Sequence, residues 1–450
     1  MMAEMVLERT ILRDLGDGLI LRRSMAADVE ELATYNAGVH SDDGPEHPDA
    51  YIAAWTRDLL KGDHPSFHVD DFTIVEDTRT GKIVSAMNLI DQTWSYDGIE
   101  FGVGRPELVA THPDYRNRGL VRAQFEVAHR WSAERGQRVQ AITGIPWYYR
   151  QFGYEMGLEL GGGRLGYLPH VPKLSEGEVE PYHMREMTEA DLPFVMDLYQ
   201  QFCRRSCLSC VRSEAQWRYE VWGKSEFNAD RCVVRVIESA SGERVGFLGH
   251  PVRIWGPTQV LRVYEIVPSL SWTAVTPSVI RYLQIVGEAN AAREKKEPFG
   301  AFGFWLGSDH PAYHAAADRL PRERKPYAWY VRVPDLSGFL LHIATAMEKR
   351  LVGSVVAGYT GELKISFYRD GLRLVLQEGR LATAETWKPT PQERGAAGFP
   401  GLTFLQLLFG YRSLDELRHA FADCWVSTDD ARALLETMFP RQYSEVWPIA

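Results

Sequence analysis

Two stretches of this chain repeat each other roughly 160 residues apart. The first is LILRRSMAADVEELATYN (19–36), and the second is YHMREMTEADLPFVMDLYQ (182–200). The identical positions are Arg22, Ala27 and Asp28 in the first copy and Arg185, Ala190 and Asp191 in the second. Each copy has the pattern of a strand end followed by an N-capped amphipathic helix. We therefore expect a duplicated structural unit, which constrains the fold more than any single motif.

The segments after each copy follow a similar order. Two β-rich runs, a further strand and a long helix come after the first copy, and the same order follows the second. The end of the chain differs, with a hairpin at 361–379 that turns at Asp370-Gly371 and amphipathic helices near 403–421 and 427–439. Since 450 residues exceed one hydrophobic core, we expect an α+β protein of three domains, at 1–175, 176–340 and 341–450.

Composition excludes several classes of function. The net charge of −10 disfavours nucleic acid as a partner. No apolar run is long enough to span a bilayer, and the N-terminus lacks the pattern of a signal peptide, so we expect a cytoplasmic protein without membrane contact. The metal-binding motif H-E-x-x-H is not present, and we expect no metal.

Three of the five cysteines lie close together, at Cys203, Cys207 and Cys210. Their C-x3-C-x2-C spacing resembles the cluster-binding loop of radical SAM enzymes, which hold iron and sulfur through such thiolates. However, the run continues a helical pattern, and Ser209 stands where that loop has an aromatic residue. Reduced thiols in a cytosolic protein are the favoured interpretation.

The segment HPDYRNRGLVRAQF (112–125) gathers Arg116, Arg118 and Arg122 around Gly119, where an extended segment becomes helical. A helix N-terminus carries unpaired N–H groups and partial positive charge, and glycine lets a phosphate approach the backbone. Arginines add matched, charge-assisted donors. The pattern predicts a pyrophosphate cradle, and the alternative is a surface loop with solvated arginines.

The wider segment VATHPDYRNRGLVRA (109–123) looks like the acetyl-CoA motif of the GCN5-related N-acetyltransferases (GNAT). Arg116, Gly119 and Val121 take the motif positions, and Val121 departs from the usual glycine or alanine. The duplicated unit and the C-terminal hairpin with helices resemble the Eis-like branch, which has two acetyltransferase-fold domains and a sterol-carrier-protein-like (SCP2-like) C-terminal domain. The resemblance implies acetyl-CoA as co-substrate and a homo-oligomer, a trimer or hexamer.

The second copy lacks the features of the cradle. Its equivalent segment is IVPSLSWTAVTP (266–277), with no arginine between Arg262 and Arg281 and no glycine between Gly256 and Gly287. It cannot offer the same phosphate site, so we expect a degenerate second domain and one catalytic centre, in the first domain.

The resemblance also implies roles for individual residues. The strand before the cradle would hold the pantetheine arm through Val109, Ala110 and Thr111, and the cradle itself would comprise Arg116, Asn117, Arg118, Gly119, Leu120, Val121 and Arg122. Within YYRQFGY (148–154), Tyr149 takes the position of the proton donor to the departing thiolate, with Tyr148 as the competing candidate. The terminal carboxylate of Ala450 would act as the base.

Acidic and aromatic residues suggest the acceptor. Asp42, Asp43 and Trp94 would line the acceptor site and suit a cationic amine such as an aminoglycoside, a polyamine or a lysine side chain. The alternative is that these carboxylates are solvated loop residues. The resulting hypothesis is an N-acetyltransferase acting by direct transfer from acetyl-CoA to a small-molecule or peptide amine. The alternative function is a non-catalytic acetyl-CoA sensor or a carrier of an apolar ligand.

Overall fold

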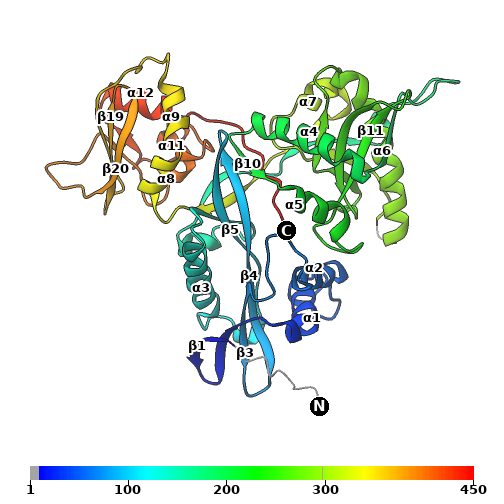
Figure 1. Ribbon diagram of the computed structural model, residues 1–450, viewed down its shortest axis with the longest axis horizontal. Coiled ribbons are helices and arrows are strands. Elements are labelled where there is room, and N and C mark those ends of the chain that lie inside the picture. The colour runs from blue at the N-terminus through cyan, green and yellow to red at the C-terminus, as the bar shows by residue number, and fades with distance from the viewer. Residues whose placement is uncertain (1–9, 296) are drawn as a thin grey trace.

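The computed structural model describes residues 10–295 and 297–450, which form three lobes (Figure 1). The first lobe is built on a mixed sheet with the order β1-β2-β3-β4-β5-β6-β17-β7, and β10 pairs with β4. Its strands are β1 (Ile11–Gly16), β2 (Leu19–Arg23), β3 (Phe72–Asp77), β4 (Lys82–Tyr96), β5 (Ile99–Thr111), β6 (Val139–Ile142), β7 (Glu155–Leu160), β10 (Leu208–Val211) and β17 (Tyr327–Arg332).

Helices cover both faces of this sheet. Figure 1 shows α1 (Val29–Val39) and α2 (Ala50–Leu60) on one side of β4 and β5, and α3 (Leu120–Glu134) on the other. The stripe of α3 that packs on the sheet includes Leu120, Phe125, Ala128 and Trp131, all buried. This burial fixes the N-terminus of α3 relative to the strand before it.

The second lobe contains two sheets, with the orders β14-β12-β11-β9 and β13-β15-β8-β16. Its strands are β8 (Gly163–Tyr167), β9 (Tyr182–Glu186), β11 (Cys232–Ser239), β12 (Arg244–Pro251), β13 (Thr258–Leu261), β14 (Val263–Ile266), β15 (Ala301–Phe304) and β16 (Arg322–Arg324). Its helices are α4 (Leu192–Arg205), α5 (Glu214–Arg218), α6 (Trp272–Glu294) and α7 (Pro311–Ala315). The mixed α+β fold expected from the sequence, with two sheet-and-helix units in tandem, is confirmed.

The two copies exchange strands. β17 follows the second copy in sequence but inserts between β6 and β7 of the first sheet. Reciprocally, β8 leaves the first copy and inserts between β15 and β16. The sheets therefore cross the sequence boundary expected at 175, and neither copy has a complete sheet without the other.

The residues of the sequence repeat have the same structural role in both copies. Arg22 pairs with Asp28 at 2.8 Å and with Glu76 at 2.7 Å. Arg185 pairs with Asp191 and with Glu238, both at 2.6 Å. In each copy the arginine on the strand thus ties the start of the next helix to the neighbouring strand, which explains why these positions recur.

The third lobe is an α+β unit with the sheet order β20-β19-β18-β21-β22. Its elements are β18 (Gly361–Ser366), β19 (Gly371–Gln377), β20 (Arg380–Trp387), β21 (Ala397–Gly398), β22 (Trp425–Val426), α8 (Leu336–His342), α9 (Ala344–Leu351), α10 (Phe404–Leu408), α11 (Leu414–Ala420) and α12 (Asp429–Met438). Within the described residues, each helix is too short or too polar to cross a bilayer.

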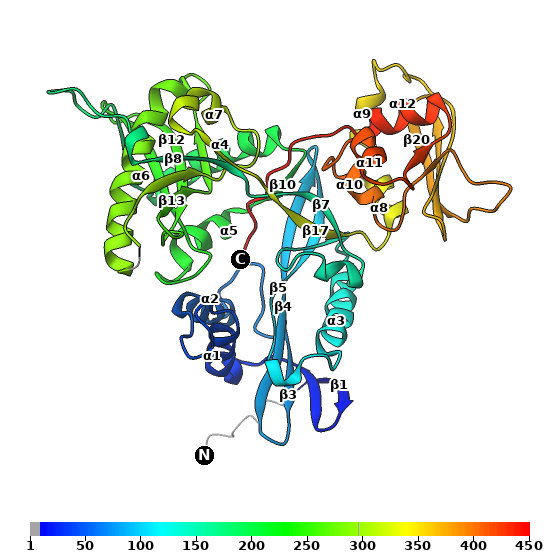
Figure 2. The ribbon, with the colours of Figure 1, turned by 180° about the vertical axis from the view of Figure 1, so that it is seen from behind.

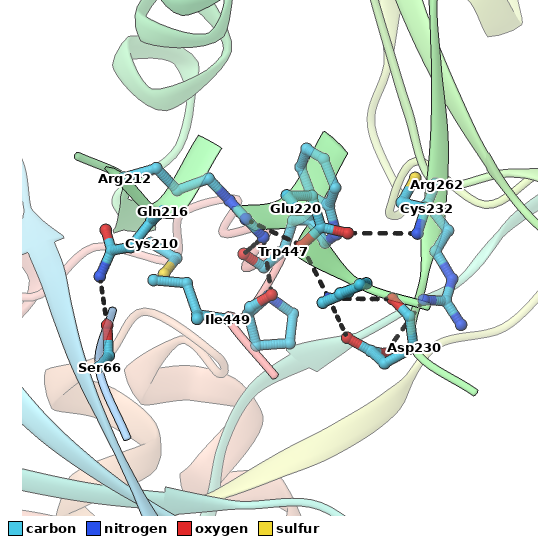
Figure 3. Close-up of polar contacts among 12 residues, drawn as sticks. Ser66, Cys210, Arg212, Gln216, Glu220, Asp230, Cys232, Arg262, Trp447 and Ile449 are labelled. Atoms are coloured by element: carbon cyan, nitrogen blue, oxygen red, sulfur yellow. Dashed lines mark hydrogen bonds and ion pairs between the residues drawn. The ribbon is translucent and has the colours of Figure 1, made fainter. Parts of the chain in front are cut away.

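The last residues leave α12 and return to the junction of the other two lobes. Figure 2 shows the C-terminus between α2 and α5. The N–H of Cys207 donates to the carbonyl of Tyr443 at 2.8 Å, and the buried Arg212 donates to the carbonyls of Trp447 at 3.2 Å and Pro448 at 2.7 Å (Figure 3). The C-terminal tail, residues 440–450, therefore joins all three lobes.

Candidate active site

The central strands of the first sheet separate where the site forms. β5 and β6 pair in parallel only at Val103 with Val139 and Gly104 with Gln140. β5 continues beyond this point and carries a bulge, because its register against β4 shifts between Ala86 and Asn88. Leu108 lies in the bulge with a φ of 51°, a conformation that bulky side chains rarely adopt. The two strands therefore open a gap at the carboxyl end of β5.

A cavity of about 700 Å³ occupies this gap, within the usual size range of a cofactor site. Its walls come from the end of α1, the end of β5, the turn before α3, the first turn of α3 and the segment after β6. The lining residues are Val39, His40, Val109, Ala110, Thr111, Tyr115, Arg116, Asn117, Gly119, Leu120, Val121, Arg122, Ile145, Tyr148, Tyr149, Gln151 and Phe152. All the predicted cofactor-binding residues except Arg118 are among them.

The turn before α3 presents its backbone to this cavity. Gly119 is the N-cap residue with a φ of 74°, and no side chain caps the helix. The N–H of Ala123 makes the first helical bond, to the carbonyl of Gly119 at 3.0 Å, which leaves the preceding amides of the helix start for a ligand. No heavy atom lies within 4 Å of a Cβ placed on Gly119. The space above the turn can therefore accept a phosphate.

Two arginines lie beside this turn without a carboxylate partner among the described residues. Arg116 donates to the carbonyl of Thr111 at 3.4 Å, and Arg122 donates to the side chain of Gln151 at 3.1 Å. Both are exposed. By contrast, Arg118 turns back to the carbonyl of Asp114 at 3.2 Å and lies over the ring of Tyr115. The positively charged wall suits the pyrophosphate of a CoA thioester, with Arg116 and Arg122 as its cations.

Tyr149 is 5% exposed and lines the cavity. Its ring packs edge to face against Phe125, Tyr154 and Tyr330. Burial, with a smaller effect of the nearby Glu107 carboxylate, raises the pKa of Tyr149 well above its usual value. A phenol of raised pKa stays protonated at neutral pH and can donate a proton.

Tyr148 also lines the cavity, less deeply buried than its neighbour. Burial raises its pKa too, while the guanidinium of Arg122 opposes the shift. The two rings meet edge to face at 5.3 Å between centroids. Both tyrosines are therefore placed to reach a bound thioester, and the choice between them needs an experiment.

The structure adds Glu107, which the sequence did not single out. It forms an ion pair with Arg105 at 2.5 Å and directly precedes the bulge at Leu108. Burial raises the pKa of Glu107, although Arg105 opposes the shift. The signal in the sequence was its position in PELVAT (106–111), the strand that leads to the cradle.

Ala450 is buried behind the bulge rather than in the cavity wall. It packs in a cluster with Leu108, Ile90 and Phe72, on the face of the sheet covered by α1 and α2. The backbone of Ala450 lies close enough to His64 to raise the pKa of that imidazole, against the dominant lowering by burial. Leu108 packs in the cluster of Ala450, whereas the next residue, Val109, lines the cavity on the opposite face of the strand. Ala450 and the cavity therefore lie on either side of the same bulge.

The predicted acceptor residues are not brought together. Asp42 and Asp43 are exposed in the loop between α1 and α2. The prediction for Trp94 needs correction, because its ring is fully buried in the core. Its indole N–H donates to Gln92 at 2.9 Å, and the ring packs against Trp329 of the inserted strand β17. The strand exchange, which the local sequence does not reveal, covers this residue.

The three clustered cysteines lie on different elements. Cys203 is on α4, Cys207 follows it, and Cys210 is on β10, where it pairs with Trp94. Among the described residues, no group of three histidine, cysteine, aspartate or glutamate side chains is arranged to hold a metal. Burial raises the pKa of all three thiols, which is typical of unreactive buried cysteines.

Comparison with known proteins agrees with this geometry. Residues 22–157 match the family model of the acetyltransferase (GNAT) domain. No curated protein sequence matches the chain significantly. Among solved structures, a GCN5-related N-acetyltransferase from Kribbella flavida is 15% identical, with a TM-score of 0.61, over 96% of this chain and 100% of that one.

Two further structures match from end to end. A GCN5-related N-acetyltransferase from Anabaena variabilis is 14% identical, with a TM-score of 0.59, over 95% of this chain and 99% of that one. Eis1 from Mycobacterium abscessus is 12% identical, with a TM-score of 0.56, over 98% and 99%. The whole chain therefore shares the fold of these proteins, and residues 22–157 are similar to the acetyltransferase (GNAT) domain.

Proposed function

We propose that the protein transfers the acetyl group of acetyl-CoA directly to the amine of a cationic small molecule or peptide. The observation that carries this proposal is the cavity at the separated strands, which joins a phosphate cradle to a buried tyrosine. Arg116 and Arg122 supply positive charge for the pyrophosphate, and Tyr149, which lines the same cavity, supplies a proton. A phosphate site alone would not need the tyrosine.

Each part of the cavity has a role in this reaction. The amides at the start of α3 and the two arginines would hold the pyrophosphate, and the exposed backbone edge of Val109, Ala110 and Thr111 would hold the pantetheine arm. The thioester, when bound, supplies the acetyl group. Tyr149 would then donate its proton to the thiolate that leaves, since the phenol lines the cavity and is protonated at neutral pH.

The amine must lose a proton to attack, and two carboxylates flank the bulge at Leu108. Ala450 lies on one side, in the same buried cluster as Leu108, and Glu107 precedes Leu108 on the strand. We favour Ala450, because Glu107 is held in an ion pair with Arg105. A variant with one glycine added after Ala450 moves the carboxylate and should lose most activity, whereas Glu107→Gln should retain more.

The acceptor is proposed to be a cationic amine, of the aminoglycoside, polyamine or lysine type. The support is the exposed acidic loop between α1 and α2, with Asp42 and Asp43, next to the cavity wall formed by Val39 and His40. This loop carries negative charge where an acceptor could approach the bulge.

The test is release of free thiol from acetyl-CoA with a panel of amines: an aminoglycoside, spermidine and a lysine peptide. We expect amine-dependent release, with kcat reduced at least tenfold in Tyr149→Phe and little changed in the matched variant Tyr148→Phe. The reverse result would assign the proton donor to Tyr148. Binding of acetyl-CoA without release by any amine would contradict the enzyme and favour a sensor.

The alternative of an apolar-ligand carrier has one supporting feature. A cavity of about 440 Å³ lies in the third lobe, between the start of α8, the hairpin turn and α10, with Leu336, Phe367 and Phe404 in its walls. A carrier would bind a fatty acid there irrespective of acetyl-CoA.

Three further expectations stay proposals: the SCP2-like relationship of this lobe, the cytoplasmic location and the homo-oligomer, a trimer or hexamer. Light scattering can test the oligomer, and localisation can test the location.

A further inference from the structure

A second cavity, of about 420 Å³, lies in the second lobe between α6 and the sheet that α6 covers. Its walls include three arginines, Arg231 before β11, Arg235 on β11 and Arg293 on α6. Nothing in the reaction proposed above uses these residues. The cavity therefore needs its own explanation.

The register of the two sheets shows which positions of the copies correspond. Arg22 faces Ile74 in the first copy, and its equivalent Arg185 faces Val236 in the second. Counting along β3 and β11 from these pairs aligns Asp71 with Val233 and Thr73 with Arg235. The pairs Thr73–Met87 and Arg235–Leu248 then align Leu89 with His250 and Asp91 with Val252.

In the first copy, an internal network of ion pairs fills the place that corresponds to this cavity. Arg135, just after α3, forms ion pairs with the carboxylates of Asp71 and of Asp91, the latter at 2.6 Å. Both carboxylates correspond to valines in the second copy. A partly buried guanidinium in the first copy is thus neutralised by the protein itself.

The second copy keeps the arginine but not its partners. Arg293 donates to the carbonyl of Val252, the residue aligned with Asp91, and so occupies the place of Arg135. Among the described residues, neither Arg293 nor Arg231 forms an ion pair. Arg235 has only Glu186, at 3.4 Å, whose side chain is 85% exposed. The other carboxylate of the cavity, Glu226, is also exposed and forms no ion pair within the described residues.

His250 also lines the cavity, but it is uncharged and so adds neither a negative nor a positive charge. His250 is 3% exposed, and its Nδ1 lies 2.9 Å from the carbonyl of Pro251, which can only accept a hydrogen bond. Its Nε2, 3.0 Å from the hydroxyl of Tyr282, must then accept the phenol proton. The guanidinium of Arg235 lies close enough to Tyr282 to oppose the rise in its pKa that burial causes. The cavity therefore has a guanidinium beside a phenol whose orientation His250 fixes.

Three guanidinium groups line this cavity, and its two carboxylates, Glu186 and Glu226, are both exposed, so an anion that enters the cavity meets net positive charge. We propose that this cavity binds a small polyanion that carries carboxylate or phosphate groups. Arg231 and Arg293 contact the anion from the rim, and Arg235, beside Tyr282, contacts it from the floor. The site lies where Val233 and Val252 of the second copy correspond to Asp71 and Asp91 of the first.

The proposal is tested by calorimetric titration of the full-length protein with inorganic phosphate and with citrate, at low salt. Saturating CoA is present so that the cradle at Gly119 is occupied. We expect one probe to bind, and to bind at least tenfold more weakly in Arg231→Gln/Arg293→Gln. The matched control is Arg138→Gln/Arg380→Gln, which removes two exposed arginines elsewhere and should bind as the wild type does.

A second variant tests the site without removing its arginines. Val233→Asp/Val252→Asp restores the carboxylates found in the first copy and should abolish binding by neutralising Arg293 internally. Absence of binding by either probe in the wild type would overturn the proposal. Equal binding in the wild type and both double variants of the cavity would also overturn it, since the anion would then lie elsewhere. Neither readout involves acetyl transfer.

Discussion

Arg105 donates a hydrogen bond of 2.8 Å to the main-chain oxygen of Ile449, the residue before the carboxyl terminus. Gln92 donates a second bond of 2.7 Å to the same oxygen. Both donors are buried and lie on β5 and β4, the central strands of the first sheet. The last residues of the chain thus complete the polar environment behind the bulge at Leu108, on which the candidate site depends.

Removal of Pro448, Ile449 and Ala450 should destabilise the protein strongly. Arg105, Gln92 and Arg212 would lose the acceptors that satisfy them, and each unsatisfied buried donor costs about 1–3 kcal/mol. We expect the free energy of unfolding in urea to fall by at least ~3 kcal/mol. The control is Val355→Ser, because that side chain is 91% exposed. An unchanged unfolding midpoint in the truncated protein would show that the tail does not stabilise the fold.

The repeat predicted the duplication because it includes the residues of a structural ion pair. Arg22 with Asp28, and Arg185 with Asp191, tie strand to helix in each copy, so their spacing is kept in the sequence. The strand exchange was not predictable in this way. Residues 163–167 and 327–332 have ordinary strand patterns, and their pairing partners depend on how the two copies dock.

Arg122→Ala and Arg116→Ala should weaken acetyl-CoA binding, because both side chains line the cavity without a carboxylate partner among the described residues. A charge-assisted hydrogen bond contributes about 1.5–3 kcal/mol, so we expect the KM for acetyl-CoA to rise about tenfold or more. Arg118→Ala is the matched control, since Arg118 points to Asp114 and Tyr115. An equal rise in all three variants would indicate only a general effect of charge.

Gly119→Ala should impair cofactor binding more than stability. The φ of 74° at this N-cap costs an alanine about 1–2 kcal/mol, but the added methyl meets no protein atom within 4 Å. The methyl group would instead occupy the space proposed for the phosphate. We expect a small fall in the melting temperature and a rise in the KM for acetyl-CoA of at least tenfold. A normal KM would place the phosphate away from Gly119.

Prediction of the site from the sequence succeeded where one short segment forms it. Arg116, Gly119 and Arg122 lie within a single turn and helix start, so local pattern and geometry coincide. It failed for Trp94, because β17, from a distant part of the chain, packs on that residue. Glu107 was missed for a related reason: its raised pKa arises from burial, which the tertiary fold decides and the local sequence does not.

Buried histidines should make the protein less stable as the pH falls below neutrality. Burial lowers the pKa of His250 to about 4 and that of His64 to about 3, whereas an unfolded histidine has a pKa of about 6.5. Between these values the unfolded state binds more protons, so stability is full above about pH 6.5 and decreases as the pH falls toward 4.

The variant His250→Gln isolates one of these groups. Each such histidine contributes a slope of about 1.4 kcal/mol per pH unit, and the variant should lose this part of the slope in urea unfolding measured from about pH 6.5 to 4.5. The variant also loses the contact with Tyr282, which lowers the free energy of unfolding by the same amount at every pH and leaves the slope unaffected. His47→Gln, at an exposed position, is the control and should retain the wild-type slope. Parallel curves for His250→Gln and the wild type would mean that His250 is protonated in the folded protein.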